Sequence, residues 1–291
     1  FLVKKNWYLA ESRLKQGIAL VNNARYKEAI PPLQSFIADN RKDNRLDEAI
    51  FWMSEAYYRS DMLNNSIDNY QSIIRRFPES KRIEEAYYGL GWSYFRLKRF
   101  KESSETFDNM IKAYPKSKFA VEVLARQGDG YYVLKQFSKA IDSYQKALKI
   151  DSKNEEALYC NYQICHAYYK MGSYEQAVTN LLNFVKKYPN SSYSDNALYL
   201  VGWIRFQQKN YHEAIQNFRF LMDAYPSSSL IVQARYTIGD SYYNLANFDA
   251  AIASYKEIVE KYPSSPLAPD ALRSMQFCLE ALGRTDEALR I

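Results

Sequence analysis

The sequence is poor in the residues from which most active sites and metal sites are built. Its 291 residues include two histidines and three cysteines, Cys160, Cys165 and Cys278. An odd cysteine count without a Cys-X-X-Cys pair predicts neither a disulfide framework nor a zinc site. The longest apolar run, from Ala197 to Ile204, is well short of the roughly 20 residues that span a bilayer. No transmembrane segment is therefore predicted.

Catalytic motifs are also missing. Cys165 and His166 are adjacent, so on a helix their side chains point about 100° apart and cannot face each other as a nucleophile and its base must. We expect Cys165 to be a packing residue and His212 to be solvated at the start of a helix. No glycine-rich phosphate-binding loop occurs. The sequence predicts no catalytic residue, no metal ligand and no cofactor.

The sequence also has little excess of charge of either sign. The net charge is +6, from 39 Lys and Arg against 33 Asp and Glu, and the two signs are interspersed. A nucleic-acid-binding protein more often has a concentrated basic stripe. With 47% hydrophobic residues and 27 tyrosines, the chain has too much apolar and aromatic content to be disordered. We therefore expect a folded protein that binds no nucleic acid.

What the sequence does contain is an internal repeat of 37 residues. A mostly aromatic or apolar column is followed, three positions later, by a small residue in every copy. The first column is Tyr26, Leu63, Phe100, Phe137, Tyr174, Tyr211, Phe248 and Thr285, and the second is Ala29, Ser66, Ser103, Ala140, Ala177, Ala214, Ala251 and Ala288. Matches at one period without a gap predict a repeat protein rather than separate domains.

A further pair of columns predicts two antiparallel helices in each repeat. Small residues recur at Gly17, Ser54, Gly91, Gly128, Cys165, Gly202 and Gly239, and large ones at Leu33, Tyr70, Phe107, Tyr144, Leu181, Phe218 and Tyr255. Glycine inside a helix costs roughly 1 kcal/mol relative to alanine, so its repetition requires close approach of a neighbouring helix. We expect the large side chains of the second helix to pack against the small positions of the first.

A proline column marks the end of the second helices, at Pro78, Pro115, Pro189, Pro226 and Pro263. Two residues after this column come Asp43, Ser80, Ser117, Asn154, Ser191, Ser228 and Ser265, which we expect to be the N-caps of the next first helices. Pro266 is expected at the first position of its helix. Pro31 and Pro32 fall inside the earliest second helix and predict a late start or a bend there.

These columns resemble the tetratricopeptide repeat (TPR) family: a small residue with a tyrosine three positions later, an alanine with an aromatic four positions later, and a terminal proline. The resemblance covers essentially the whole chain. It implies an all-α TPR solenoid, a right-handed superhelix of antiparallel helix pairs with about seven full repeats plus a truncated one. Because TPRs repeat about every 34 residues, we expect the extra residues to lengthen the first helix by nearly a turn.

The predicted array is single and continuous over residues 1–291, as part of a longer native chain. Its repeats are predicted at residues 10–46, 47–83, 84–120, 121–157, 158–194, 195–231, 232–268 and 269–291, the last one truncated. The aromatic–Pro–X–Ser junction resembles bacterial cell-envelope TPR proteins. Examples are the lipoprotein of the outer-membrane β-barrel assembly machine and the periplasmic protein associated with the Tol–Pal system. This resemblance implies a periplasmic protein.

The TPR resemblance implies that the first helices line a concave groove in which a partner binds. Positions i, i+3 and i+7 share one helical face, so side chains at these positions are expected to line that groove together. The predicted partner-binding residues are Glu48, Phe51, Glu55, Glu85, Tyr88, Trp92, Glu122, Asp129, Tyr162, Tyr199, Trp203, Tyr236 and Asp240. Solvent-facing Trp and Tyr dominate binding hot spots. Alternatively, the aromatic column only packs neighbouring helices, and the glutamates form a solvated face.

The sequence therefore predicts a non-catalytic scaffold for protein–protein interaction. The expected ligand is a protein or peptide segment with apolar anchors and some Lys or Arg, and salt should weaken its binding. The expected setting is a bacterial cell-envelope assembly complex. The alternatives are a cytoplasmic adaptor, a scaffold of a secretion, pilus or flagellar apparatus, and the docking arm of a larger enzyme.

Overall fold

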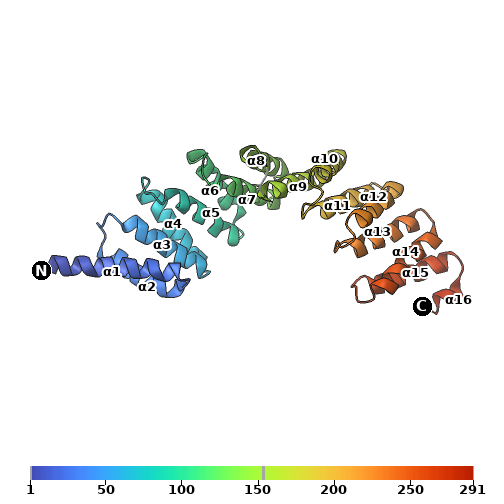
Figure 1. Cartoon of the computed structure of the whole chain (residues 1–291), viewed down its shortest axis with the longest axis horizontal. Helices are drawn as coiled ribbons and strands as arrows, with labels where there is room; N and C mark the ends of the chain where they lie inside the picture. Colours follow the sequence, from blue (N-terminus) through green and yellow to red (C-terminus); the bar gives the residue numbers. More distant parts are fainter. Residues whose placement is uncertain (1, 153–154, 291) are drawn as a thin grey trace. The chain divides into compact units, whose positions relative to one another are not determined.

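The computed structural model describes residues 2–152 and 155–290, and within these ranges the chain forms helices joined by short turns (Figure 1). The first eight are α1 (Leu2–Asn22), α2 (Tyr26–Asp39), α3 (Leu46–Arg59), α4 (Leu63–Arg76), α5 (Ile83–Arg96), α6 (Phe100–Ala113), α7 (Ala120–Val133) and α8 (Phe137–Ile150). The others are α9 (Glu155–Lys170), α10 (Tyr174–Lys187), α11 (Ser194–Gln207), α12 (Tyr211–Ala224), α13 (Ile231–Asn244), α14 (Phe248–Lys261), α15 (Ala268–Ala281) and α16 (Thr285–Ala288). The all-α prediction is confirmed. None of these described helices combines the length and apolarity needed to cross a membrane.

The chain divides into two compact units, of which unit 1 is Phe1–Cys160 and unit 2 is Asn161–Ile291. Odd-numbered helices are the first helices of the repeats, and even-numbered helices are the second. In unit 1, α1 packs on α2, α2 on α3, and so on to α8, while α3 also contacts α1 and α5. In unit 2, α10 to α15 pack in the same order, and α11 also contacts α13. Each unit therefore has the neighbour-to-neighbour packing of a repeat solenoid.

The repeat period holds in the structure, but the extra residues are not where we expect them. The second helices begin at the first column of the repeat, from Tyr26 to Thr285. Helices α3, α5 and α7 are each 14 residues long, and so are α4, α6 and α8. The predicted lengthening of the first helix is therefore wrong. The additional residues lie in the turn before the next first helix, for example in residues 77–82.

The close approach predicted for the glycine column is confirmed. A Cβ atom on Gly91 would lie 2.1 Å from Cε1 of Phe107, and one on Gly128 would lie 2.4 Å from Cε1 of Tyr144. Both rings are fully buried. The same crowding recurs in unit 2 at Gly239. The ring of the second helix occupies the space that a methyl group would need, which explains why glycine recurs inside these helices.

The turn within each repeat has a feature that the sequence does not reveal. Two positions before each second helix, the backbone has a positive φ, at Ala24, Asp61, Lys98, Lys135, Gly172, Lys209, Ala246 and Gly283. The following N–H bonds back across the turn, as from Arg99 to the Tyr94 carbonyl at 2.9 Å. This is the Schellman arrangement that ends a helix. Most of these positions are not glycine, so the column does not stand out in the sequence.

The capping serines lie earlier than expected. Ser80 is followed by a short turn before α5 begins, and its Oγ accepts the N–H of Arg82 at 3.1 Å. The same hydroxyl donates to Asp47, on the preceding first helix α3, at 2.5 Å. Ser117 and Ser228 make the same pair of contacts. The column therefore stabilises the turn and links successive first helices, and the prediction that it caps the helix itself is wrong by about two residues.

The proline predictions are also corrected in part. Helix α2 begins in register with the other second helices and runs through Pro31 and Pro32, so the late start is wrong. Its inner face is buried, and that packing holds the helix despite the missing N–H groups. Pro266 precedes α15, and the proline in the first turn of that helix is Pro269. The cap predicted at Asn154 lies outside the described residues.

Candidate functional site

A pocket in unit 1 brings together three of the predicted site residues. It lies between α3 and α5, has a volume of about 240 Å³, and is lined by Glu55, Tyr58, Arg59, Tyr88, Gly89 and Trp92. The three aromatic side chains are half-buried and provide apolar surface. Glu55 and Arg59 add one charge of each sign. This combination can hold an apolar side chain of a ligand next to a polar one.

Contacts with α5, with the turn before α7 and with α7 itself fix Tyr88 at the edge of this pocket. Its ring stacks on Phe119 with the centroids 4.4 Å apart, and Trp92 meets it edge-on at 6.3 Å. Its hydroxyl donates to Glu122 at 2.9 Å. Burial, together with this carboxylate, raises the pKa of Tyr88 above its ordinary value, so the hydroxyl stays protonated at neutral pH. A side chain that is already fixed loses little entropy when a ligand binds.

Glu55, Asp129 and Asp240 occupy one column of the 37-residue repeat, and all three have a structural role that the sequence prediction does not include. Each accepts a hydrogen bond from a buried tyrosine hydroxyl on the second helix of its own repeat, 15 residues later. The pairs are Tyr70 with Glu55 and Tyr144 with Asp129 in unit 1, and Tyr255 with Asp240 in unit 2. Buried hydroxyls need such partners. These carboxylates therefore have a structural role as hydrogen-bond acceptors, independent of any ligand.

The column has no acid where the second helix buries no tyrosine. Trp92, His166 and Trp203 occupy it in other repeats, and the residues 15 positions later are Phe107, Leu181 and Phe218. None of these three has a hydroxyl group. An acid thus occurs where a buried tyrosine needs an acceptor. The other residues in the column are Ile18, Trp92, His166, Trp203 and Phe277. Comparison of the two columns is the sequence signal that reveals this pairing.

Asp129 is the most heavily engaged of these acids. One oxygen accepts the hydroxyls of Tyr144 and Tyr159, each at 2.7 Å, and the other lies 2.7 Å from Arg126. Arg126 also pairs with Glu156. Burial raises the pKa of Asp129, although Arg126 and the two hydroxyls oppose the shift. These contacts occupy the carboxylate and leave it little capacity for a ligand.

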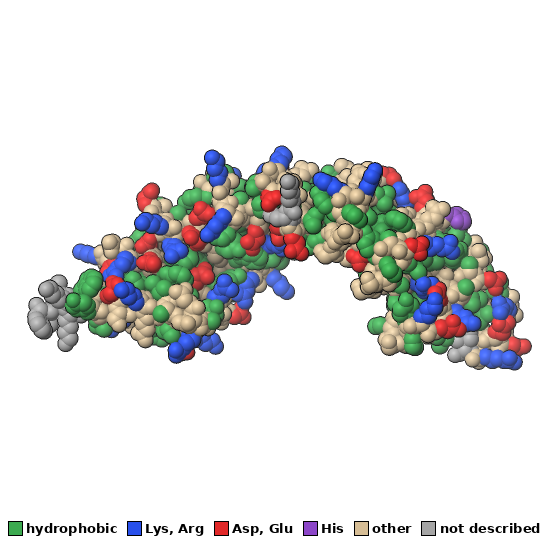
Figure 2. Space-filling model, viewed as in Figure 1, with side chains coloured by type: hydrophobic (Ala, Val, Ile, Leu, Met, Phe, Trp, Pro, Cys, Tyr) green, Lys and Arg blue, Asp and Glu red, His purple; other side chains and the backbone are tan. Residues whose placement is uncertain are grey.

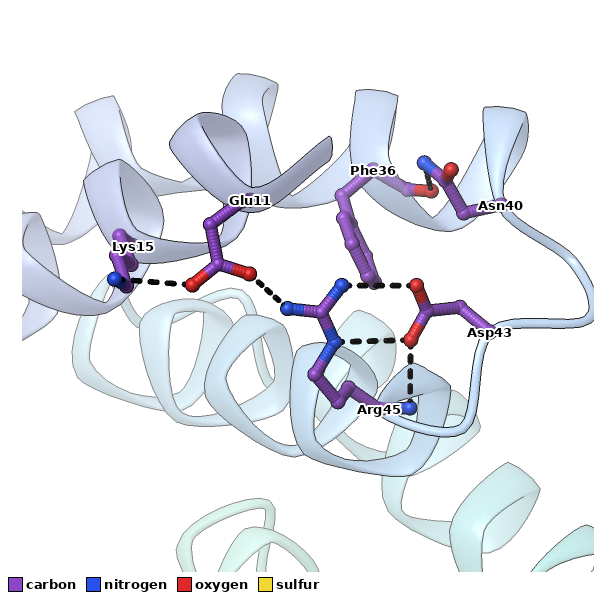
Figure 3. A network of polar contacts seen from close by, with 6 residues as sticks. All are labelled: Glu11, Lys15, Phe36, Asn40, Asp43 and Arg45. Atoms are coloured by element: carbon purple, nitrogen blue, oxygen red, sulfur yellow. Dashed lines mark hydrogen bonds and ion pairs between the residues drawn. The ribbon is translucent and has the colours of Figure 1, made fainter. Parts of the chain in front are cut away.

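Glu11, Glu48, Glu85 and Glu122 recur at the 37-residue period and form a glutamate column, whose first residue has its carboxylate paired with two basic side chains. Glu11 lies 3.0 Å from Lys15 and also pairs with Arg45, which in turn binds Asp43 at 2.9 Å (Figure 3). Hydrogen bonding to Lys15 and Arg45 lowers the pKa of Glu11. The carboxylate at this end of unit 1 is therefore neutralised by its neighbours.

The later glutamates of the column differ in their surroundings. Glu48 is half-buried and forms no ion pair with any described residue. Glu85 lies 3.6 Å from Arg82, and Glu122 accepts the Tyr88 hydroxyl. Figure 2 shows acidic and basic side chains interspersed on the visible face of each unit. The first-helix face of unit 1 is thus less acidic than its sequence suggests.

Phe51 does not lie on the surface where we predict it. It is 5% exposed and belongs to the core that joins α3, α4 and α5, with its ring 6.2 Å from that of Tyr70. The guanidinium group of Arg82 lies over the ring at 5.1 Å. Because neighbouring side chains cover it, Phe51 cannot contact a ligand, and its assignment to the groove is wrong.

In unit 2, the predicted site residues connect successive first helices. Tyr162 stacks on Tyr193 at 5.3 Å, and its hydroxyl lies 2.9 Å from Nε2 of His166. Trp203 donates from Nε1 to the Tyr169 hydroxyl at 3.2 Å. These contacts support the alternative that the aromatic columns pack neighbouring helices together.

Tyr199 and Tyr236 complete this set on α11 and α13. The ring of Tyr199 lies 5.3 Å from Phe218, and that of Tyr236 lies 5.4 Å from Tyr255. The Tyr236 hydroxyl lies 3.1 Å from Oγ of Ser274. Both tyrosines are half-buried, so each has a packed side and an accessible side.

Tyr58 and Arg59 line the unit 1 pocket but are absent from the sequence prediction. The sequence does contain a signal for Tyr58, because Tyr58, Phe95, Tyr132, Tyr169, Phe206 and Tyr243 form one aromatic column. From Phe95 to Tyr243, each ring of this column contacts the first residue of the next second helix, as Phe95 contacts Phe100 at 5.2 Å. This column lies in the last turn of each first helix. It comes after the i, i+3 and i+7 positions from which the groove is predicted, so the prediction does not include it.

The packing role predicted for Cys165 and the exposure predicted for His212 are confirmed. Cys165 is 3% exposed, its thiol donates to the Asn161 carbonyl at 3.3 Å, and burial raises its pKa to about 12. Burial lowers the pKa of His166 to about 4, so this side chain is neutral at pH 7. His212 is exposed at the start of α12. Among the described residues, no group of three or more His, Cys, Asp or Glu could hold a metal ion.

Known proteins share this arrangement of helix pairs. The family model of YfiO, described as an outer membrane lipoprotein, matches residues 10–129 and 126–289. This chain belongs to the YfiO family. The match extends over nearly the whole sequence and confirms the predicted resemblance to TPR proteins of the cell envelope. No match was found among curated proteins.

Solved structures share the fold of this YfiO-family chain at low sequence identity. The C-terminal part of a TPR repeat-containing protein from Cytophaga hutchinsonii has a TM-score of 0.70 at 15% identity, over 89% of this chain and 99% of that one. The apo form of RapI has a TM-score of 0.64 at 13% identity, over 97% and 84% of the two chains. A tetratricopeptide repeat protein from Parabacteroides merdae has a TM-score of 0.58 at 12% identity, over 92% and 99%. These likenesses confirm a TPR solenoid, which together with the family supports a role as a protein-interaction scaffold.

Proposed function

We propose that this YfiO-family protein is a non-catalytic scaffold that binds a segment of a partner protein on the first-helix face of unit 1. The observation that carries the proposal is the pocket between α3 and α5, where Tyr58, Tyr88 and Trp92 surround a cavity. Half-buried aromatic side chains of this kind contribute most of the binding energy at protein interfaces. The proposed setting is a bacterial cell-envelope complex in the periplasm, and its support is the family to which the chain belongs.

The proposed ligand inserts one apolar or aromatic side chain into this pocket. A volume of about 240 Å³ is below the roughly 300–1,000 Å³ of small-molecule sites, so it suits a single anchoring side chain. Glu48 and Glu85 lie on the same helical faces as the pocket and favour Lys or Arg next to the anchor. Arg59 and Arg82 partly offset them. Salt should therefore weaken binding only modestly, because few charges remain uncompensated.

Site-specific photocrosslinking tests this proposal. A photoreactive phenylalanine analogue replaces Tyr58 in the pocket, and in a control protein it replaces Tyr243, which occupies the same repeat column in unit 2. Each protein is irradiated in a native envelope extract, and the products are identified by mass spectrometry. We expect a discrete protein product from position 58 only, and we expect it to disappear when Tyr88→Ala and Trp92→Ala are added. Identical products from both positions would show that the pocket is not the partner site.

A further inference from the structure

The second helices of unit 2 carry an apolar groove that the proposed function does not use. It lies between α10 and α12 and has a volume of about 450 Å³. Its walls include Leu182 and Phe220, which are 41% and 54% exposed, and its base includes the fully buried Leu198. Side chains of this size are normally covered when they lie next to one another.

The other repeats show that the fold does not require these two apolar residues. The positions equivalent to Leu182 are Gln34, Gln71, Asp108, Gln145, Arg219 and Lys256, and those equivalent to Phe220 are Ser35, Ser72, Asn109, Lys146, Asn183 and Glu257. Every one of them is polar. The two apolar exceptions occur in successive repeats and line the same groove. Packing within the solenoid therefore does not explain them, whereas a bound partner does.

The groove is also held in shape by the chain itself. The Tyr225 hydroxyl, at the end of α12, donates to the Pro189 carbonyl in the turn after α10 at 2.7 Å. Both residues line the groove. This hydrogen bond joins the two walls, so the groove exists before a partner arrives and binding requires little rearrangement.

Charge narrows the choice of occupant. Lys186 is the one charged residue among the described residues that line the groove, and Lys187 follows it on α10. Both lysines are exposed, and neither forms an ion pair with a described residue. The nearest carboxylate along α12, that of Asp223, is not part of the lining. Electrostatic complementarity therefore favours a partner that brings a carboxylate to Lys186.

We propose that this groove is a second docking site, which binds an amphipathic helical segment of another protein. The segment places two apolar side chains, spaced at i and i+3 or i+4, on Leu182 and Phe220, and a carboxylate on Lys186. This site is independent of the pocket in unit 1, because it uses second helices and belongs to the other unit.

Selection from a display library of random peptides tests the site. The peptides have about 16 residues, enough for four helical turns, and they are selected on the wild-type protein and then measured by fluorescence anisotropy. The test variant is Leu182→Gln/Phe220→Asn, which places at both exposed positions the residue of the preceding repeat. Val133→Asn, at a position that is 54% exposed in unit 1, is the matched control.

We expect groove-dependent peptides to carry two apolar residues at helical spacing and at least one Asp or Glu. Their affinity should fall at least about tenfold in the double variant and about as much in Lys186→Glu. The affinity should be unchanged in Val133→Asn and in Tyr88→Ala/Trp92→Ala. This result tests the groove independently of whether the unit 1 pocket binds a partner. The proposal is overturned if no peptide distinguishes the double variant, or if the peptides that do are basic.

Two further measurements address other occupants. Sedimentation velocity compares the wild type with the double variant, and a dimer that only the wild type forms would assign the groove to a second copy of the chain. Flotation with vesicles of phosphatidylethanolamine and phosphatidylglycerol makes the same comparison for lipid. Vesicle binding that the double variant loses would contradict a protein ligand. If the wild type neither forms such a dimer nor binds vesicles through the groove, the result supports a segment of another protein as the ligand.

Discussion

Replacing Asp240 by alanine tests whether the acids of the first-helix column support the fold. Its carboxylate accepts the hydroxyl of Tyr255 at 2.6 Å, and Tyr255 is 1% exposed. The substitution removes the acceptor from a hydroxyl that water does not reach, which costs about 1–3 kcal/mol of unfolding free energy. Asp240→Asn retains an acceptor oxygen and should cost less than about 1 kcal/mol.

A double-mutant cycle isolates this hydrogen bond from other effects of the substitution. Tyr255→Phe alone leaves a half-buried carboxylate without its donor and should cost about 1 kcal/mol. Asp240→Ala/Tyr255→Phe removes both groups and resembles the repeats that bury a phenylalanine, such as Phe107. The double variant should therefore lose less than the sum of the single variants, with a coupling energy of about 1–2 kcal/mol.

Urea unfolding followed by circular dichroism gives the overall loss. Because repeat arrays can unfold in parts, hydrogen exchange of the α13 and α14 amides should be measured on the same proteins. Faster exchange in Asp240→Ala, partly reversed by Tyr255→Phe, is the expected result. If the losses of unfolding free energy in the two single variants add up to that of the double variant within about 0.5 kcal/mol, the structural role of Asp240 is refuted. Ligand binding would then remain the explanation for the acids of this column.

Three other substitutions have defined outcomes. Gly91→Ala, whose Cβ would lie 2.1 Å from the Phe107 ring, should lower stability to urea by about 1–3 kcal/mol, and Phe107→Leu should restore part of it; no loss would show that the helices can separate at low cost. Lys98→Gly, at a φ of 59°, should raise Tm because it relieves left-handed backbone strain worth up to about 1 kcal/mol; an unchanged or lower Tm contradicts this. Burial raises the pKa of the Asp240 carboxyl group above 3.8, so the folded state binds the proton of this group more tightly than the unfolded state does. The stability that the protonated carboxyl group contributes is therefore lost as pH rises through its folded-state pKa. The cost of Asp240→Asn relative to wild type should therefore become smaller as pH rises above about 4 in urea titrations, and a cost that does not change with pH would contradict the sign.

The helix pairs could be predicted because packing repeats along the sequence. A glycine such as Gly91 must recur where the second helix brings a ring such as Phe107 against it, and this constraint is visible at one period. The backbone conformation of the turns is harder to predict from the sequence. Lys98 adopts a positive φ at a position where most other repeats also lack glycine, so no residue type marks the turn. The proline pair in α2 misleads in the same way, because burial outweighs local preference there.

Only the site residues that share one face of a single helix could be predicted from the sequence. Tyr88 and Trp92 follow from helical spacing, and the structure brings them together. Phe51 occupies the equivalent position but is covered by Arg82, which comes from the turn before the next helix. Glu55 lines the same pocket, yet its hydrogen bond to Tyr70 depends on a different helix, α4. Such contacts require the tertiary arrangement or a comparison of columns.

The most direct test of the proposed function is the affinity of the crosslinked partner segment, measured by calorimetry. The test protein is Tyr88→Ala/Trp92→Ala, and the matched control is Tyr87→Ala/Tyr114→Ala, which removes an aromatic pair 6.4 Å apart outside the pocket. If Tyr88 and Trp92 each contribute about 1 kcal/mol or more, as hot-spot residues do, affinity should fall at least about tenfold in the test protein and stay within about twofold in the control. Equal affinities for all three proteins would contradict a partner site on the first-helix face of unit 1.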